Sequence, residues 1–443
     1  MIMTTLSIAV WIRPGYAVGL VLCCFVFEQW AQAGSNVFVS YYWLTNYMTA
    51  LIVLMAFTSM MMQQQMRLPK LGAGAGVLAA MYVYCAISVV WSVDRGETLG
   101  VLRSSLIYLI PFGFLAPLAA SDTKAIRDGL VMTVVLGLFL LITLLMNPNW
   151  SVRGVQLAVE GTANNQIREI GNPLELASLG GYLAIIIALL KLPFLPDWFR
   201  WARWLVVGLA LTLIIASSSR GQFFASVGVI ILMLPFAYKI KSLGNFISIV
   251  FGIGIVGVLA LVLLQTSTGE RFAIANMLEN YWDTRLGPSA ILLGAWAEAG
   301  VLYWLLGLGS SASFSNDIIG FYPHFVPAEV LGELGLVGMG MYLVAYALIL
   351  RAFYRSFSAV APFPEARSLV ATVFGLALFY SLLTLKQGSF IASYPLMIFF
   401  IMIGTIDRDV RVMLAAGAQG MMPQAPQNIE NTANRSGERV QPV

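Results

Sequence analysis

The sequence predicts an all-α, polytopic integral membrane protein. Of its 443 residues, 59% are hydrophobic and only 10% are charged, and the mean hydropathy is +0.83. An average soluble domain carries about 25% charged residues, so a soluble fold of this size could not cover its surface with polar groups. The composition therefore excludes a soluble globular enzyme, a disordered chain and a secreted disulfide-rich scaffold.

Apolar runs long enough to cross a bilayer recur along the chain, and they predict a transmembrane bundle over residues 1–406. No internal repeat is evident, which disfavours an inverted-repeat transporter. The tail at 407–443 has few large apolar residues, so we expect it to be a largely disordered cytoplasmic segment. The twelve expected spans are 14–29, 44–63, 71–91, 100–119, 128–147, 173–191, 203–217, 221–238, 244–265, 327–350, 368–386 and 388–406.

The distribution of basic residues predicts that both termini are cytoplasmic. With that orientation, seventeen of the 25 Lys and Arg residues lie on the inner side and eight on the outer side, as the positive-inside rule requires. Two large loops, 148–172 and 266–326, then face outward. The apolar segment 290–308 contains Glu298, and a crossing there would place the later arginines outside. We therefore expect it to lie in the outer loop before the tenth span, against the membrane surface or the bundle.

Several kinds of site are disfavoured by the residues present. The three cysteines, Cys23, Cys24 and Cys85, lie in apolar runs and are expected to be buried free thiols. One histidine, no outer cysteine and no Asp-x-Asp pair in the outer loops disfavour a metal site. Walker A and dinucleotide-binding fingerprints are absent, so we expect no cofactor. The net charge of +4 is too small and too dispersed to predict nucleic-acid binding.

The outer basic residues are mostly arginines, which suits phosphate recognition. Seven of the eight are Arg, whose planar fork binds phosphate through two hydrogen bonds. Arg103 falls inside an expected span, and Arg220 follows three serines between two spans. An ionisable group at membrane depth is a functional candidate. The alternative, which we favour for Arg95 and Arg271, is snorkelling or pairing with an outer carboxylate.

His324 is the only histidine in the chain and lies just before the tenth span. A lone histidine often has a structural role. However, Pro323 and Pro327 restrict the backbone around this one, and it faces the same side as the arginines. A neutral imidazole can accept a proton from a sugar hydroxyl near neutral pH. We therefore predict that His324 is a general base.

The order of these motifs resembles a known family. Ser219-Arg220-Gly221 begins a span, and a large outer loop follows that contains Arg285, the Gly307-x-Gly309 turn and His324; Glu333 and Gly335–Gly338 come next. Over residues 205–350 this pattern resembles the O-antigen ligase and polymerase superfamily of bacterial envelope enzymes. Arg168 with Gly171-Asn172-Pro173 is similar to a segment common in these proteins. Many members have Asn after the histidine, where this chain has Phe325.

The resemblance implies inverting, metal-independent glycosyl transfer on the periplasmic side of the bacterial inner membrane. The donor would be a glycan on undecaprenyl diphosphate, and the acceptor a sugar hydroxyl of the lipid A core. Arg220, Arg285 and Arg168 would bind the diphosphate, and His324 would activate the acceptor. We also single out Ser219, Glu329 and Arg103 as supporting residues, with Glu329 as an alternative base.

Other functions remain open from the sequence. A polymerase of the same superfamily, which joins lipid-linked repeat units, would use the same residues. We place the ligase first because the Arg/Arg/His pattern lies in one compact loop system. A protein O-oligosaccharyltransferase is a third option, disfavoured by the lack of a large C-terminal soluble region. The rival from another class is a flippase for lipid-linked sugars, which should carry charges through the middle of several spans.

Overall fold

The computed structural model describes most of the chain, and helices dominate this part. The described residues are 2–66, 69–146, 150–151, 154–157, 168–169, 172–192, 199–238, 244, 247, 254 and 286–418. Three short antiparallel strands, β1 (Trp150–Ser151), β2 (Gly154–Leu157) and β3 (Arg168–Glu169), pair in the order β1-β2-β3. The expected helical, membrane-type architecture is therefore confirmed, with this small sheet as an addition.

Eight helical segments in the described part of the chain are long and apolar enough to cross a membrane. Each coincides with one of the expected spans. They are α2 (Tyr16–Gly34), α4 (Leu44–Gln63), α5 (Ala73–Ile87) with the 3-10 turn Ser88–Val90, α6 (Arg95–Tyr108) continued through the π-helical turn Leu109–Leu115 into α7 (Ala116–Ala119), α8 (Thr123–Leu145), α11 (Arg220–Ala237), α16 (Val326–Val360) and α17 (Pro364–Thr384).

The other expected spans are less simply matched. Helices α9 (Pro173–Leu189), α10 (Phe199–Ala216) and α18 (Tyr394–Ala418) occupy three of the expected positions, although the apolar parts of α9 and α10 are shorter. The expected span 244–265 lies outside the described residues, apart from three isolated positions. Two further helices, α1 (Ile2–Ile12) and α3 (Asn36–Ser40), were not expected. The count of twelve spans stays a prediction.

The apolar segment 290–308 forms no continuous helix. It folds into α14 (Gly287–Glu298) and α15 (Val301–Leu306), which are separated at Gly300 with φ +94°. Helices of 12 and 6 residues are too short to cross a bilayer. Both pack against α16, so the segment lies against the bundle, and its side of the membrane stays a prediction.

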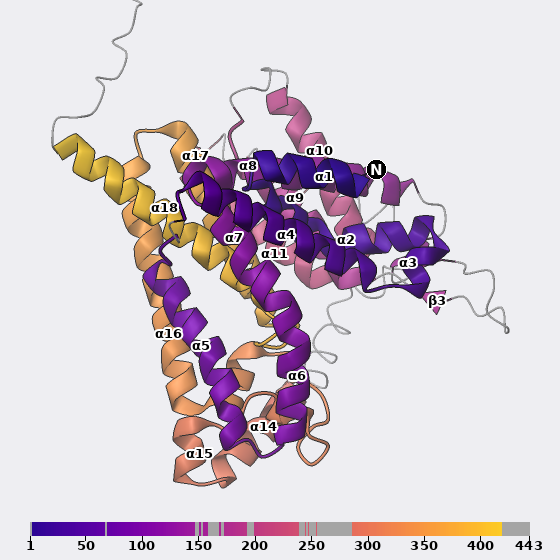
Figure 1. Cartoon of the computed structure of the whole chain (residues 1–443), viewed down its shortest axis with the longest axis vertical. Coiled ribbons are helices and arrows are strands. Elements are labelled where there is room, and N and C mark those ends of the chain that lie inside the picture. Colours follow the sequence, from indigo (N-terminus) through magenta and orange to yellow (C-terminus); the bar gives the residue numbers. More distant parts are fainter. Residues whose placement is uncertain are drawn as a thin grey trace, which may run out of the picture.

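The helices form a main bundle and a projecting group. In the bundle, α2 packs on α8, α9 on α10, and α11 on both α9 and α17. Helices α5, α6, α14 and α15 and the first half of α16 extend away from it, at the bottom of Figure 1. Helix α16 packs along α5 and also against α17 and α18, so it connects the two groups.

Helix α18 continues to Ala418, twelve residues beyond the end of the expected last span at 406. Ion pairs stabilise this extension. Asp407 is only 4% exposed, and its carboxylate pairs with Arg355 of α16 and with Arg411 at 3.1 Å. The remainder of the expected disordered tail, 419–443, lies outside the described residues.

One cluster of polar groups inside the bundle is paired internally, as the cost of polar groups in a membrane interior favours. Glu28 accepts hydrogen bonds from Gln32 Nε2 at 3.1 Å and Asn46 Nδ2 at 3.0 Å. Cys24 Sγ donates to Asn46 Oδ1 at 3.4 Å. Cys23, Cys24 and Cys85 are all buried free thiols, as expected from the sequence.

Candidate functional site

A break in α16 organises the region around His324. Gly335 has φ +65° and ψ −165°, a conformation that is essentially restricted to glycine. The helix is interrupted there, so the carbonyls of Gly332 and Glu333 can accept hydrogen bonds from outside it. They accept from Leu308 N at 3.0 Å and Gly309 N at 2.9 Å respectively. The loop that precedes α16 is thereby fixed to the break.

The Glu333 carboxylate fastens the same loop from within. It is 3% exposed and accepts from Ser311 N at 2.5 Å, Ser313 N at 3.1 Å and Ser313 Oγ at 2.6 Å. Gly307 has φ +79°, and a side chain there would collide with the Glu333 backbone. The Gly307-x-Gly309 turn and Glu333, two parts of the family-like pattern, therefore form one structural unit.

The loop is also tied to the turn between α5 and α6. Thr98 Oγ1 donates to Ser310 O at 2.6 Å, and Ser310 N donates to Ser88 Oγ at 2.8 Å. Val93 N donates to Leu308 O at 3.0 Å. Contacts to three separate segments hold the loop on a rigid framework, which is how loops in enzymes present functional side chains.

His324 ends this loop in a left-handed conformation, with φ +58°. Such a conformation is uncommon for residues other than glycine, although Asn, Asp and His adopt it more often than most. The imidazole is partly buried, and the Tyr322 ring lies edge-on to it with 4.3 Å between ring centroids. Burial, and then the charge of Glu329, raise the pKa of Tyr322 above its ordinary value. The Tyr322 hydroxyl therefore stays protonated at neutral pH and cannot act as the base.

Glu329 lies in the first turn of α16, and only one of its two carboxylate oxygens has a hydrogen-bond partner among the described residues. Its side chain is buried, and Oε1 accepts from Phe390 N at 2.9 Å. Oε2 is buried without a hydrogen-bond partner among the described residues, an arrangement that costs free energy. Phe390 in turn stacks on Tyr82 of α5, with 5.2 Å between centroids. Glu329 thus attaches the start of α16 to the α17–α18 connection, residues 385–393.

The start of α11 carries one cation, Arg220, and is contacted by a second, Lys386. Arg220 is its first residue, and the buried Gln222 accepts from Lys386 Nζ at 2.5 Å and from Ser219 Oγ. Gln222 Nε2 also donates to Gln387 Oε1 at 2.8 Å. Lys386 thus lies across the N-terminus of an 18-residue helix, where the helix dipole and free N–H groups favour an anion.

Gly221 makes this placement of Lys386 possible. A Cβ atom at Gly221 would lie 2.5 Å from Lys386 Nζ and 2.6 Å from its Cε. Real Cβ atoms do not approach other atoms so closely, so any side chain would displace the lysine. The Ser219-Arg220-Gly221 motif therefore combines an arginine with a gap that a second cation occupies.

The α17–α18 connection joins the two halves of the site. Lys386 and Gln387 contact the start of α11, and Phe390 contacts Glu329 five residues after His324. Lys386 and Phe390 are four residues apart, so at most about 14 Å of chain separates these contacts. The structure therefore links the cations at α11 to the start of α16.

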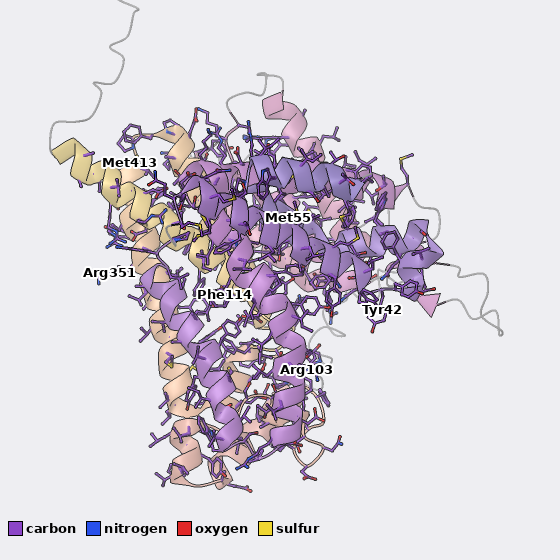
Figure 2. The ribbon with its side chains drawn as sticks, viewed as in Figure 1. Tyr42, Met55, Arg103, Phe114, Arg351 and Met413 are labelled. Atoms are coloured by element: carbon purple, nitrogen blue, oxygen red, sulfur yellow. The ribbon has the colours of Figure 1, made fainter. Side chains whose placement is uncertain are left out.

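None of the other sequence-predicted residues is shown to join this group in the part of the chain that the structure describes. Arg285 lies outside the described residues. Arg168 belongs to β3, whose backbone alone is described; in Figure 1, β3 lies well apart from α14 and α15. Arg103 is exposed and projects outward from α6 (Figure 2), which favours an interfacial role over diphosphate binding.

Sequence reasoning missed Lys386, Gln222 and Gln387 as site residues. Lys386 carried one signal, because it is the only lysine among the eight basic residues assigned to the outer side. Gln222 and Gln387 carried none, since their role depends on contacts between segments 165 residues apart.

No profile of a known protein family matches the chain, and no curated protein sequence matches it. Among the described residues, no group of three His, Cys, Asp or Glu side chains could hold a metal ion.

Proposed function

We propose that the protein is an inverting glycosyltransferase of the O-antigen ligase type. It transfers a glycan from undecaprenyl diphosphate to a sugar hydroxyl of the lipid A core, on the periplasmic side of the bacterial inner membrane. The observation that carries this proposal is the linkage of two elements. Lys386 bonds to Gln222 in the first turn of α11, the helix that Arg220 begins, and the 385–393 connection also bonds to Glu329, five residues after His324 in the chain.

The cations would act on the leaving group. As the bond between the sugar C1 and the phosphate oxygen breaks, negative charge develops on the diphosphate. Gln222 holds Lys386 at the α11 N-terminus before the reaction, so the lysine, with Arg220 at the start of the same helix, would stabilise that charge with little rearrangement. Gln222 holds the lysine, and Ser219 and Gln387 in turn hold the Gln222 amide.

His324 would act on the acceptor. Its imidazole takes the proton of the acceptor hydroxyl while that oxygen bonds to C1 from the face opposite the diphosphate, which inverts the configuration. The products are the glycosylated acceptor and undecaprenyl diphosphate.

A strain that lacks the protein tests this function. Loss of all glycan-capped lipid A, with uncapped core remaining, supports the ligase. Retention of core with a single repeat unit would instead indicate the polymerase. Accumulation of the lipid-linked donor on the cytoplasmic leaflet would indicate a flippase and contradict the proposed transfer reaction.

A further inference from the structure

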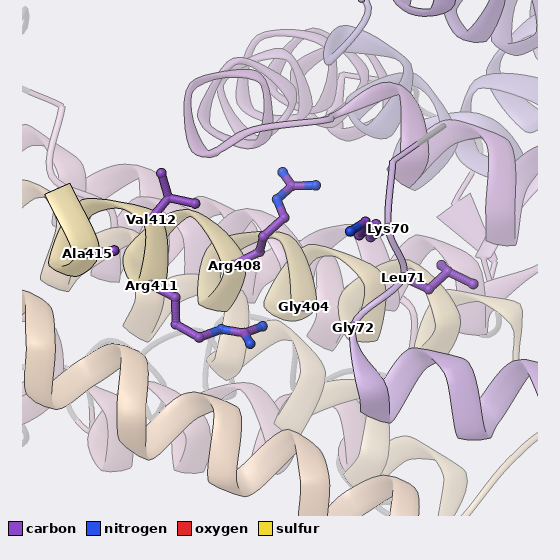
Figure 3. A pocket seen from close by; sticks show the side chains of 8 residues that line it. All are labelled: Lys70, Leu71, Gly72, Gly404, Arg408, Arg411, Val412 and Ala415. Carbon is purple, nitrogen blue, oxygen red and sulfur yellow. The ribbon is translucent and has the colours of Figure 1, made fainter. Parts of the chain in front are cut away.

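A second candidate site lies at the other end of α18 from the 385–393 connection. It is a pocket of about 400 Å³ between α18 and the segment that leads into α5 (Figure 3). Arg408 follows Tyr394, the first residue of α18, by fourteen residues, which corresponds to about 20 Å along the helix. The residues that line it are Lys70, Leu71, Gly72, Gly404, Arg408, Arg411, Val412 and Ala415.

Two glycines form the closed end of this pocket. Gly72 and Gly404 are in backbone contact: a Cβ on Gly72 would lie 2.6 Å from Gly404 Cα. Because neither residue has a side chain, the two segments touch here and diverge beyond. The space between them is therefore a property of the backbone packing rather than of a mobile side chain.

The polar side chains of the pocket are all cationic. Arg408 and Arg411 extend from opposite sides of α18, and Lys70 faces the helix from the segment across the pocket (Figure 3). Arg408 pairs with Asp409 at 3.0 Å, and Arg411 with Asp407 at 3.1 Å. Lys70 makes no ion pair with another described residue. Three cations against two carboxylates leave an excess positive charge at the opening.

Apolar surface continues directly from this charge. Val412, Met413 and Leu414 on α18 are 64%, 47% and 49% exposed, although they follow a charged turn at the end of a long helix. Exposed apolar residues beside basic ones are typical of a membrane interface. There, lipid acyl chains cover the apolar residues, and lipid phosphates pair with the basic ones. A ligand that fits both has a phosphate and a hydrocarbon part.

We propose that this pocket binds the phosphate head group of an anionic phospholipid, with Lys70 and Arg408 as its cationic contacts. With the predicted orientation, the lipid belongs to the cytoplasmic leaflet. The site is separate from the proposed transfer reaction and does not depend on it.

Thermal unfolding of the full-length protein in a zwitterionic detergent tests this proposal. Added phosphatidylglycerol should raise the midpoint, whereas phosphatidylcholine and inorganic phosphate at the same concentrations should not. Lys70→Gln should raise the phosphatidylglycerol concentration needed for half of the midpoint shift by about fivefold, because one basic residue near an anionic surface contributes roughly this factor in affinity. Lys70→Arg should retain it.

Lys124→Gln is the matched control, because Lys124 is exposed on the same predicted face and does not line the pocket. It should respond to phosphatidylglycerol like the parent. Equal responses of Lys70→Gln and the parent would overturn the site. Equal protection by inorganic phosphate would overturn the lipid as its ligand, and equal protection by phosphatidylcholine would overturn the requirement for negative charge.

Discussion

At the scale of single residues, Gly221 determines where Lys386 can lie. The lysine crosses the start of α11 within 2.6 Å of the position that a Cβ would take. The glycine therefore contributes to the site by having no side chain. This gives a physical role to the third residue of the Ser219-Arg220-Gly221 motif, which the family resemblance marks only as part of a pattern.

We expect Gly221→Ala to displace Lys386 and lower glycan transfer by about 10²-fold, the usual cost of losing one preorganised charge contact. Gly228→Ala is the control. Gly228 lies in the same helix with open space around it, so both changes raise helix propensity and only one affects the lysine. Capped lipid A in complemented cells, normalised to protein level, reports the difference. Similar capping by both variants would exclude a role for the placement of Lys386.

His324 can be tested without straining its backbone. Its φ of +58° suits asparagine better than alanine, so His324→Asn should insert and fold normally. Because the amide cannot accept the proton, kcat should fall about 10²- to 10⁴-fold with little change in KM for the donor. The parent rate should also fall on acidification, because protonated imidazole is no longer a base. A His324→Asn variant with parental kcat would assign the base elsewhere, with Glu329 the next candidate.

At the scale of elements, the break in α16 is the feature that holds the loop preceding this helix, residues 307–325. Gly335 allows the carbonyls of Gly332 and Glu333 to bind the loop, and Glu333 then fastens it through Ser311 and Ser313. Gly335, the first residue of the Gly335–Gly338 part of the family-like pattern, thus has a structural explanation. The sequence alone does not reveal it, because a glycine in an apolar helix is compatible with an unbroken span.

Gly335→Ala should destabilise the protein by about 1–3 kcal/mol, because alanine is strained at this φ and ψ and would collide with the Leu305 carbonyl. Gly340→Ala, five residues further along α16 with open space around the glycine, should be neutral or slightly stabilising. Thermal unfolding in detergent measures both. Equal midpoints for the two variants would show that the break is not required.

At the scale of the whole molecule, the predicted topology places the site outside the cell membrane. Reporter fusions at residues 120, 195, 240 and 360 should all read cytoplasmic, because the basic residues concentrate on that side. The fusion at 360 is the most informative. A periplasmic signal there would place His324 on the cytoplasmic side and contradict a periplasmic reaction.

The span positions could be predicted because the bilayer fixes the length of an apolar helix. For the segment 290–308, Glu298 and the arginines that follow predicted only that it does not cross the membrane. The division into two helices at Gly300 was not predicted. The pairing of Lys386 with Gln222 could not be predicted, since it depends on how α11 and α17 pack. The continuation of α18 to Ala418 was missed for a similar reason: the ion pairs of Asp407 with Arg355 and Arg411 stabilise it, and such contacts are invisible to composition.

Transfer by the purified protein tests the central claim most directly. The components are the enzyme in detergent, a glycan on undecaprenyl diphosphate, and lipid A core that lacks the glycan. We predict equimolar undecaprenyl diphosphate and glycosylated core with inverted anomeric configuration, undiminished by EDTA and largely lost in Arg220→Lys, which keeps the charge but not the two-pronged phosphate contact. Intact donor and acceptor after incubation with active, folded protein, together with movement of the donor across proteoliposome membranes, would contradict the claim.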